Sequence, residues 1–448
     1  MDKLNKEIIR LSLPTIISNV TIPLLGICDT AISGHLDSEL FLSAIAVGTV
    51  MLNVVFWIFG FLRGGTTGLT ANALGAGDTN EISKVFYRSI LIAVVAGSLL
   101  IILQDFIFQG LWFIAGGSDE IKDYVEEYFT IRIWGSPALL CIIAISGWFV
   151  GMQTTFYPML IAIVTNVINI AMSFLLAFPY GYGFKGVALG TLIANWLGLA
   201  IACGCIFWFL KGKLLKCSFH NLLIGNWLRY FSVNGNLFLR SFFIICVTMG
   251  VTAAGARLGN LTLAVNIIVM QYFQFFSFFI DGFAYSGEAM VGLRMGEMNY
   301  PMLKSCVKRL LQWTVGTGIL FSIGYFIGIE SITSLLTNSE NVLDGVLQLT
   351  AWVALIPVVS CIAFIFDGFY VGITDTFKMM LSSLIGGVFF FALLSLEHTG
   401  SIELNFLQGN HLIWSAFLGY LLVRGAYLAL MWRSALKRQF RALNVSSL

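Results

Sequence analysis

The strongest constraint on this chain is its series of long apolar segments without charge. Residues 91–104 and 196–210, for example, contain no Asp, Glu, Lys or Arg. Only 11% of the 448 residues are charged, against about 25% in soluble domains, which is too little charge to cover a water-facing surface. A bilayer core needs roughly 20 apolar residues for each helix that crosses it. We therefore expect an integral membrane protein with many spans.

The apolar runs predict an all-α polytopic membrane protein with twelve transmembrane helices. The runs are continuous and do not alternate between apolar and polar residues, as the strands of a membrane barrel do. The predicted spans are residues 11–34, 42–73, 86–104, 128–151, 157–180, 186–210, 231–257, 261–292, 309–328, 348–372, 378–396 and 410–432.

The basic residues predict the orientation of these spans. Twelve spans place both termini on one side, and eighteen of the 25 Lys and Arg residues fall on that side. Only Lys122, Lys185 and Arg257 fall on the opposite side, and the others lie within spans. Because cytoplasmic loops are enriched in Lys and Arg, we expect a multi-pass protein of the plasma (inner) membrane with both termini in the cytoplasm.

The composition and motifs argue against several other functions. The formal net charge of +2 provides no basic surface for nucleic acid. The sequence lacks the G-x-x-x-x-G-K-[ST] motif of ATP-hydrolysing proteins. The eight Cys and four His show no metal-ligand or catalytic spacing, so we expect no cofactor and no enzyme activity. The expected partners are the lipid bilayer and a small organic substrate, and we expect a monomer.

A weak internal repeat divides the chain near its midpoint. Residues 45–64 align with 263–282 at an offset of 218, and residues 146–151 align with 367–372 at an offset of 221. The repeat predicts two pseudo-symmetric six-helix bundles, parallel because six is an even number, around a central cleft. The predicted domains are an N-lobe at 1–210, a cytoplasmic linker at 211–230 and a C-lobe at 231–448.

Asp29 is the most informative charged residue within the spans. Pro14 and Pro23 precede it, and Pro23 removes the backbone hydrogen bond to Asn19, which predicts a kink. A carboxylate inside the membrane needs a partner, water or a functional role. A desolvated carboxylate can load and release a proton near neutral pH, so we expect Asp29 to exchange the coupling ion. The alternative is a structural Asp bonded to Asn or Thr groups of neighbouring helices.

Three further carboxylates lie in the spans of the second half. Asp281, Tyr285 and Glu288 are spaced i, i+4, i+7 and share one helix face, and Asp367 lies in a later span. Asp281 and Glu288 either bind a cation such as Na⁺, pair with Arg240, or keep one group protonated, and Asp367 is a further candidate for the cation site. The sequence leaves these alternatives open.

Other polar residues of the spans are candidates for lining the cleft. Arg63 aligns with Asp281 in the repeat and is either a binding element or the partner of a carboxylate. Arg132 and Arg424 lie toward span ends, where a long side chain can reach the interface. The amides of three Asn residues either line the first-lobe cavity or bond helices together; they are Asn166, Asn169 and Asn195.

Four segments carry a more specific pattern. They are residues 22–36 (IPLLGICDTAISGHL), 61–71 (FLRGGTTGLTA), 281–288 (DGFAYSGE) and 367–372 (DGFYVG). In these segments the chain resembles the multidrug and toxic compound extrusion (MATE) family, in particular its DinF-like branch. The resemblance implies two six-helix bundles around a central cleft and drug export against inward H⁺ or Na⁺. It also implies that Asp29 is the protonation site.

We therefore expect a secondary antiporter that exports an organic, amphipathic or cationic compound by alternating access. Protonated and deprotonated Asp29 must then favour different conformations or substrate affinities. The alternative is a flippase for lipid-linked saccharides or lipids, as in related two-bundle exporters. A flippase would need a basic cavity, and only Arg63 and Arg240 supply positive charge here. The substrate and the choice of H⁺ or Na⁺ stay open.

Overall fold

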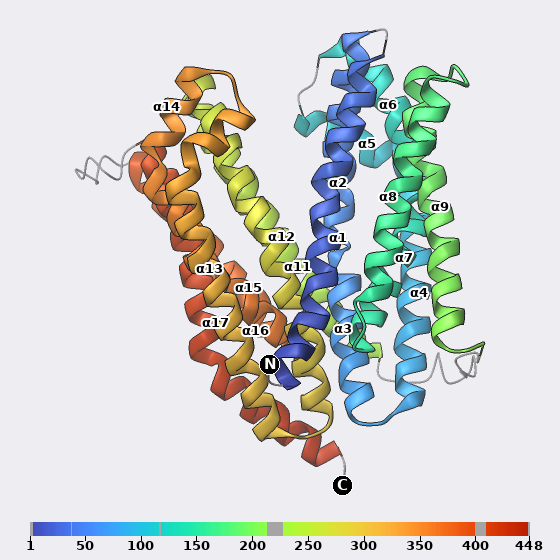
Figure 1. Cartoon of the computed structure of the whole chain (residues 1–448), viewed down its shortest axis with the longest axis vertical. Coiled ribbons are helices and arrows are strands. Elements are labelled where there is room, and N and C mark those ends of the chain that lie inside the picture. The colour runs from blue at the N-terminus through green and yellow to red at the C-terminus, as the bar shows by residue number, and fades with distance from the viewer. Residues whose placement is uncertain (1–2, 37, 116–117, 213–226, 399–408, 447–448) are drawn as a thin grey trace. The chain divides into compact units, whose positions relative to one another are not determined.

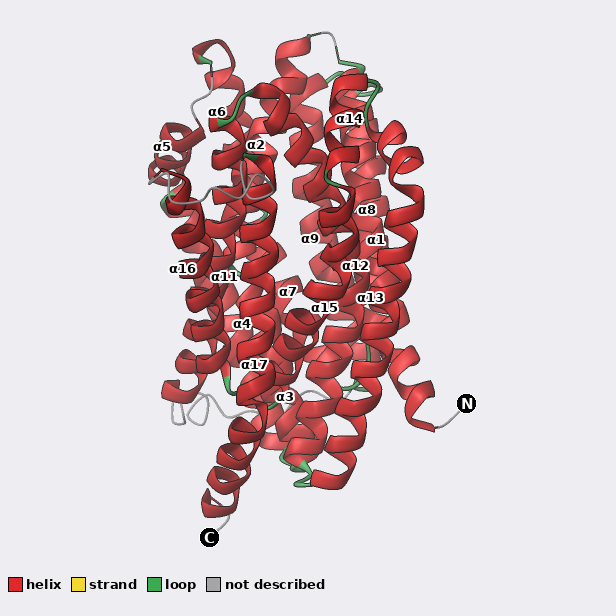
Figure 2. Ribbon diagram, turned by 90° about the vertical axis from the view of Figure 1, so that its left-hand side faces the viewer, coloured by secondary structure: helices red, strands yellow, loops and turns green. Residues whose placement is uncertain are grey.

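The described part of the chain is helical throughout. The computed structural model describes residues 3–36, 38–115, 118–212, 227–398 and 409–446, and every regular element in these ranges is an α-helix (Figures 1 and 2). The all-α fold that the sequence predicts is confirmed.

The helices fall into two series along the chain. The first series is α1 (Lys3–Gly34), α2 (Glu39–Ile58), α3 (Gly60–Gly75), α4 (Thr79–Ile102), α5 (Gln104–Ala115), α6 (Asp119–Ile133), α7 (Ser136–Gly151), α8 (Phe156–Ala177) and α9 (Gly183–Phe209). The second series is α11 (Trp227–Arg257), α12 (Asn260–Gly296), α13 (Tyr300–Leu336), α14 (Glu340–Gln348), α15 (Thr350–Gly372), α16 (Thr376–His398) and α17 (Asn410–Ser446).

The predicted spans agree with the helices. Among the described residues, eleven segments are long and apolar enough to cross a membrane, and the pair α6 and α7, bent by 51°, brings the number to twelve. Each predicted span falls on one of these segments. Helices α5 and α14 occupy stretches for which the sequence predicts no span.

The residues group into two compact units. One unit is Leu13–Trp227, and the other joins Met1–Ser12 to Leu228–Leu448. The start of α1 therefore belongs to the C-terminal unit, where the Ser12 hydroxyl lies 2.8 Å from that of Ser286. In the same unit, the Trp313 indole donates to Asn5 Oδ1 at 3.2 Å. The predicted lobe boundaries stay a prediction, and most of the predicted linker, residues 213–226, lies outside the described residues.

The backbone of the two units repeats at an offset of 221. A Cβ on Gly147 would lie 2.4 Å from the carbonyl oxygen of Arg63, and one on Gly368 would lie 2.3 Å from that of Ala284. The positive-φ residues Gln153 and Thr374 are also 221 apart. Arg63 therefore corresponds to Ala284, and the equivalence with Asp281 that the offset of 218 suggested is wrong. A shift of three residues keeps the same helix face, so apolar patterning did not reveal the error.

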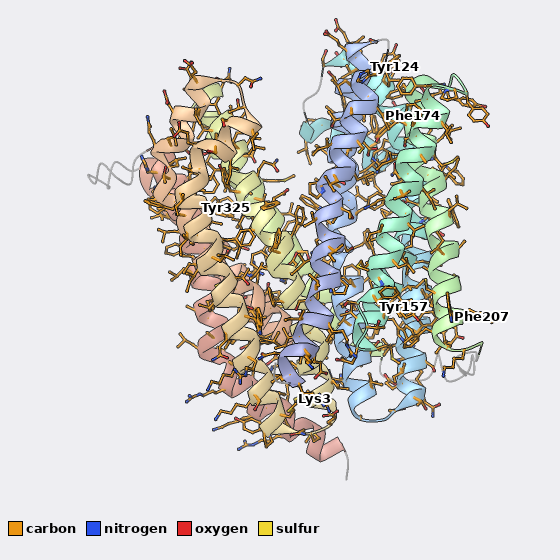
Figure 3. The ribbon with its side chains drawn as sticks, viewed as in Figure 1. Lys3, Tyr124, Tyr157, Phe174, Phe207 and Tyr325 are labelled. Atoms are coloured by element: carbon orange, nitrogen blue, oxygen red, sulfur yellow. The ribbon has the colours of Figure 1, made fainter. Side chains whose placement is uncertain are left out.

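Aromatic side chains mark both ends of the N-terminal unit. Figure 3 shows Tyr157 and Phe207 toward one end of this unit and Tyr124 and Phe174 toward the other. Exposed Trp208 lies at the first end, just after Phe207. Aromatic residues at both ends of a helical bundle are typical of membrane–water interfaces, which agrees with a bilayer-spanning unit.

Candidate functional site

Asp29 provides a carboxylate inside the N-terminal unit. Helix α1 runs without a break through Pro14 and Pro23 and carries Asp29 in its last third. The side chain is half-buried. Its Oδ1 atom is fully shielded, and no described residue forms a hydrogen bond with it. A shielded carboxylate oxygen without a donor is energetically unfavourable when ionised, which makes Asp29 a candidate for reversible protonation.

Arg132 supplies the positive charge near Asp29. It lies at the end of α6, and its charge acts on the Asp29 carboxylate. Its guanidinium donates to the hydroxyl of Tyr128 at 2.8 Å and to that of Thr49 at 3.3 Å. The central carbon of the guanidinium also lies 5.3 Å from the ring centre of Tyr128, within the range of a cation–π interaction. Arg132 is thus held by α2 and α6, and does not simply extend to the interface.

The predicted amides divide between two roles. Asn166 of α8 donates to the hydroxyl of Thr21 on α1 at 2.9 Å. Thr21 and Asp29 are eight residues apart and therefore lie on one face of α1. Asn169 donates to Thr191 of α9 at 3.3 Å and accepts from Ser173 at 3.1 Å. Asn166 thus faces the helix that carries Asp29, whereas Asn169 bonds α8 to α9.

The remaining predicted residues of this unit lie at helix crossings. The amide nitrogen of Asn195, on α9, lies 2.8 Å from the place that a Cβ on Gly135 would occupy. Gly135 separates α6 from α7, so Asn195 packs against the bend between them. The Arg63 backbone contacts Gly147 where α3 crosses α7.

The C-terminal unit contains a network of buried charges. Asp367 of α15 accepts hydrogen bonds from both Arg240 of α11 and Arg424 of α17, through the same oxygen, Oδ2. Arg424 is 3% exposed and also donates to the hydroxyl of Tyr420 at 3.3 Å. The expectation that Arg424 extends to the interface is therefore wrong. Arg240 pairs here with Asp367, a partner that the sequence alternatives, Asp281 and Glu288, did not include.

The acidic face of α12 borders this network. The charge of Asp281 acts on Arg424, so Asp281 is electrostatically part of the same group. Glu288 is buried, whereas Asp281 and Tyr285 are half-buried. Among the described residues, no three His, Cys, Asp or Glu side chains form a group that could hold a metal ion. The carboxylate of Asp367 instead binds two guanidinium groups.

Tyr128 and Tyr420 belong to these networks but were not among the predicted site residues. Tyr128 precedes Arg132 by four residues, and Tyr420 precedes Arg424 by four. In both pairs the guanidinium donates to the phenol and lies near the aromatic face, with centroid distances of 5.3 and 6.0 Å. Residues four apart meet on a helix, so a Tyr-x-x-x-Arg pattern within a span is the sequence signal that would have found them.

These features together define a class of protein. Ionisable groups inside spans mark ion or substrate pathways in membrane proteins, and repeated helical units are the architecture of secondary transporters. A chain of two repeated helical units, each with charged groups among its spans, is a polytopic membrane transporter.

Comparison with known proteins identifies the family. The MatE family profile matches residues 14–175 and 237–394. The chain is 32% identical over 435 residues to the DNA damage-inducible protein F of Escherichia coli (strain K12), covering 96% of this chain and 92% of that protein. It is 27% identical over 213 residues to the probable multidrug resistance protein NorM of Thermotoga maritima, covering 46% and 45% of the two chains.

The fold is also found among solved structures. The bent form of the Vibrio cholerae MATE transporter VcmN matches 97% of this chain and 98% of its own, with a TM-score of 0.84 at 16% identity. The chain belongs to the MatE family, and its resemblance to the DinF-like branch is confirmed.

Proposed function

We propose that this chain is a secondary antiporter that exports organic, drug-like compounds across the cytoplasmic membrane in exchange for H⁺ or Na⁺. Membership of a transporter family supports the class of activity. The name of the related NorM protein, a probable multidrug resistance protein, supports the substrate class. The activity is transport and not catalysis, and the energy comes from an ion gradient without ATP.

The observation that carries the proposal is the environment of Asp29. One oxygen of its carboxylate is shielded and lacks a hydrogen-bond donor among the described residues, and the charge of Arg132 acts on it. Ionised and protonated Asp29 therefore interact differently with the same surroundings. Such a difference between two states is what coupling of ion and substrate requires.

The test compares wild type with Asp29→Asn in proteoliposomes loaded with a pH-sensitive dye. Ethidium serves as the cationic, amphipathic probe. In the wild type, ethidium movement should drive proton movement, and Asp29→Asn should abolish it because an amide cannot exchange a proton. Repeating the assay with and without Na⁺ distinguishes the two coupling ions.

Asp344→Asn is the matched control, because Asp344 is an exposed residue of the short helix α14. This variant should retain wild-type coupling. If Asp29→Asn retains ethidium-driven proton or sodium movement, Asp29 has no part in coupling and the proposal for its role fails.

We also propose that both termini lie in the cytoplasm and that the protein works as a monomer. The orientation rests on the distribution of Lys and Arg between the two sides.

A further inference from the structure

A cavity of about 400 Å³ with polar and apolar lining lies within the C-terminal unit. Three segments line it, namely the first turns of α11, the turn between α15 and α16, and the last part of α17. Its lining includes Arg229, Asn236, Thr374, Thr376, Phe377 and Arg438. Two candidate spans begin at Trp227 and Thr376, and a third ends at Arg441. The cavity therefore lies at the ends of three spans, at the depth of lipid headgroups.

Positive charge exceeds negative charge around this cavity. The only carboxylate among the described residues that line it, Asp375, is 3% exposed. Its Oδ1 lies 2.5 Å from Arg438 Nη2, and its Oδ2 lies 3.9 Å from Lys378 Nζ. Burial raises the pKa of Asp375, and the charges of Arg438 and Lys378 oppose that rise. The single negative charge of Asp375 thus lies beside two positive charges, those of Arg438 and Lys378.

Arg229 adds a third positive charge. Its side chain is exposed, and its guanidinium donates to the Thr374 hydroxyl at 3.3 Å. Within the described ranges, no carboxylate forms an ion pair with Arg229. A guanidinium presents several donors in a planar fork that matches the oxygens of phosphate. The hydroxyl of Thr376 and the amide of Asn236, which are joined by a 3.3 Å hydrogen bond, lie in the same lining.

Apolar side chains adjoin the charged ones. Phe377 lines the cavity and is 52% exposed. Leu228 and Phe231 flank Arg229 on α11 and are also exposed. A free phosphate ion has no group to place against these side chains, whereas a phospholipid has acyl chains. Basic pockets between membrane-spanning helices near the cytoplasmic surface are known to bind anionic headgroups.

We propose that this cavity binds the phosphate group of an anionic phospholipid, with Arg229 as the principal ligand. The site belongs entirely to the C-terminal unit and does not involve Asp29. The lipid-binding proposal can therefore be tested independently of the proposed antiport.

The test measures lipid binding to the purified, delipidated full-length protein by native mass spectrometry. Dioleoylphosphatidylglycerol is the probe, and dioleoylglycerol, which lacks phosphate, is the reference lipid. Wild type should bind phosphatidylglycerol more tightly than dioleoylglycerol. Arg229→Gln should weaken phosphatidylglycerol binding about tenfold, as expected for the loss of a charge-assisted hydrogen bond.

Arg433→Gln is the matched control, since it removes another exposed arginine, in the same part of α17 as Arg438. The affinity of Arg433→Gln for phosphatidylglycerol should stay within about twofold of wild type. The affinity of Arg229→Lys should lie between those of wild type and Arg229→Gln. Equal affinities of Arg229→Gln and Arg433→Gln, or binding of dioleoylglycerol as tight as that of phosphatidylglycerol, would overturn the proposal.

A competition experiment with a soluble phosphate ester distinguishes a phospholipid headgroup from a free phosphate compound as the ligand. Glycerol 3-phosphate is added in competition with phosphatidylglycerol. Failure to compete at millimolar concentration supports a site that needs the lipid chains. If glycerol 3-phosphate competes in the wild type but not in Arg229→Gln, the phosphate site is supported, and it also accepts soluble phosphate esters.

Discussion

At the scale of single residues, the buried carboxylates of the two units differ in their partners. In the N-terminal unit, a shielded oxygen of Asp29 has no hydrogen-bond donor among the described residues. In the C-terminal unit, Asp367 accepts from two arginines, and the charge of Asp281 acts on one of them. Asp367 also has a buried oxygen without a donor, Oδ1, but the two guanidinium groups on its Oδ2 favour its ionised form, whereas no guanidinium of the described residues donates to Asp29. We therefore regard Asp29 as the better candidate for exchange and Asp367 as a fixed counter-charge.

This difference predicts that Asp367→Asn destabilises the protein. The substitution removes the carboxylate that pairs directly with buried Arg424, and breaking a buried ion pair in this way costs about 3–5 kcal/mol. Chemical unfolding in detergent micelles measures the loss in the free energy of unfolding.

The comparison variant is Arg240→Gln. Arg240 is the more exposed of the two arginines, with 22% of its side chain accessible, and its removal leaves Asp367 paired with Arg424. Arg240→Gln should therefore cost less than Asp367→Asn. An equal or larger loss in Arg240→Gln would contradict the assignment of Asp367 as the centre of the network.

At the scale of helices, glycine determines how closely two spans can approach. The crossing of α15 with α12 depends on Gly368, just as the crossing of α7 with α3 depends on Gly147. In both crossings the missing Cβ allows a backbone carbonyl of the other helix to take its place. Small residues at helix contacts are the usual device for close packing in membranes.

Gly368→Ala should therefore destabilise the C-terminal unit. The new methyl group would meet the Ala284 carbonyl oxygen at 2.3 Å, and backbone cannot move aside as a flexible side chain can. Overpacking of this kind costs about 1–3 kcal/mol, which lowers the midpoint of thermal unfolding.

Gly316→Ala provides the matched control in α13. Gly316 is exposed, and no atom lies within 4 Å of the position that a Cβ would take there. Because Ala favours helix more than Gly does, this variant should unfold at the wild-type temperature or slightly above. Equal destabilisation by both substitutions would show that the crossing is not the cause.

Sequence patterns predicted the spans well because the length of an apolar segment is determined by consecutive residues and does not depend on tertiary contacts. They missed α14, which has only nine residues, and α5, which follows α4 after a break at Leu103. They also gave the wrong repeat offset around Arg63, since a shift of three residues preserves a helix face. The matched contacts of Gly147 with Arg63 and of Gly368 with Ala284 fix the register.

The charged networks were harder to predict than the helices. The pairing of Asp367 with Arg240 was not among the alternatives, which paired Arg240 with Asp281 or Glu288, and Arg424 was expected at the interface. Its position in the network depends on how α15 packs against α17, a contact between residues 57 positions apart. The cavity near Arg229 was not predicted at all, because it combines three segments that are distant in sequence.

At the scale of the whole molecule, the distribution of Lys and Arg predicts the orientation in the membrane. Thr337–Ser339 follow α13 and should lie outside the cytoplasm, whereas the C-terminus should lie inside. Alkaline phosphatase, which is active only outside the cytoplasm, should be active when inserted after residue 338. Green fluorescent protein fused after Leu448 should fluoresce.

The same two reporters, exchanged between the two positions, provide the control. Alkaline phosphatase after Leu448 should be inactive, and green fluorescent protein after residue 338 should be dark. An active phosphatase at the C-terminus would contradict the proposed cytoplasmic location of that terminus.

The division of α1 between the two units has a mechanical consequence. Residues 3–12 pack in one unit and residues 13–34 in the other, and the division falls beside Pro14, whose ring nitrogen cannot donate to the Arg10 carbonyl. A rotation of one unit against the other would bend or untwist this helix, in which Pro14 and Pro23 each remove a backbone hydrogen bond. Asp29 lies about 22 Å beyond Pro14 on the same helix, and Pro23 lies between them, so a bend at either proline shifts Asp29 relative to residues 3–12.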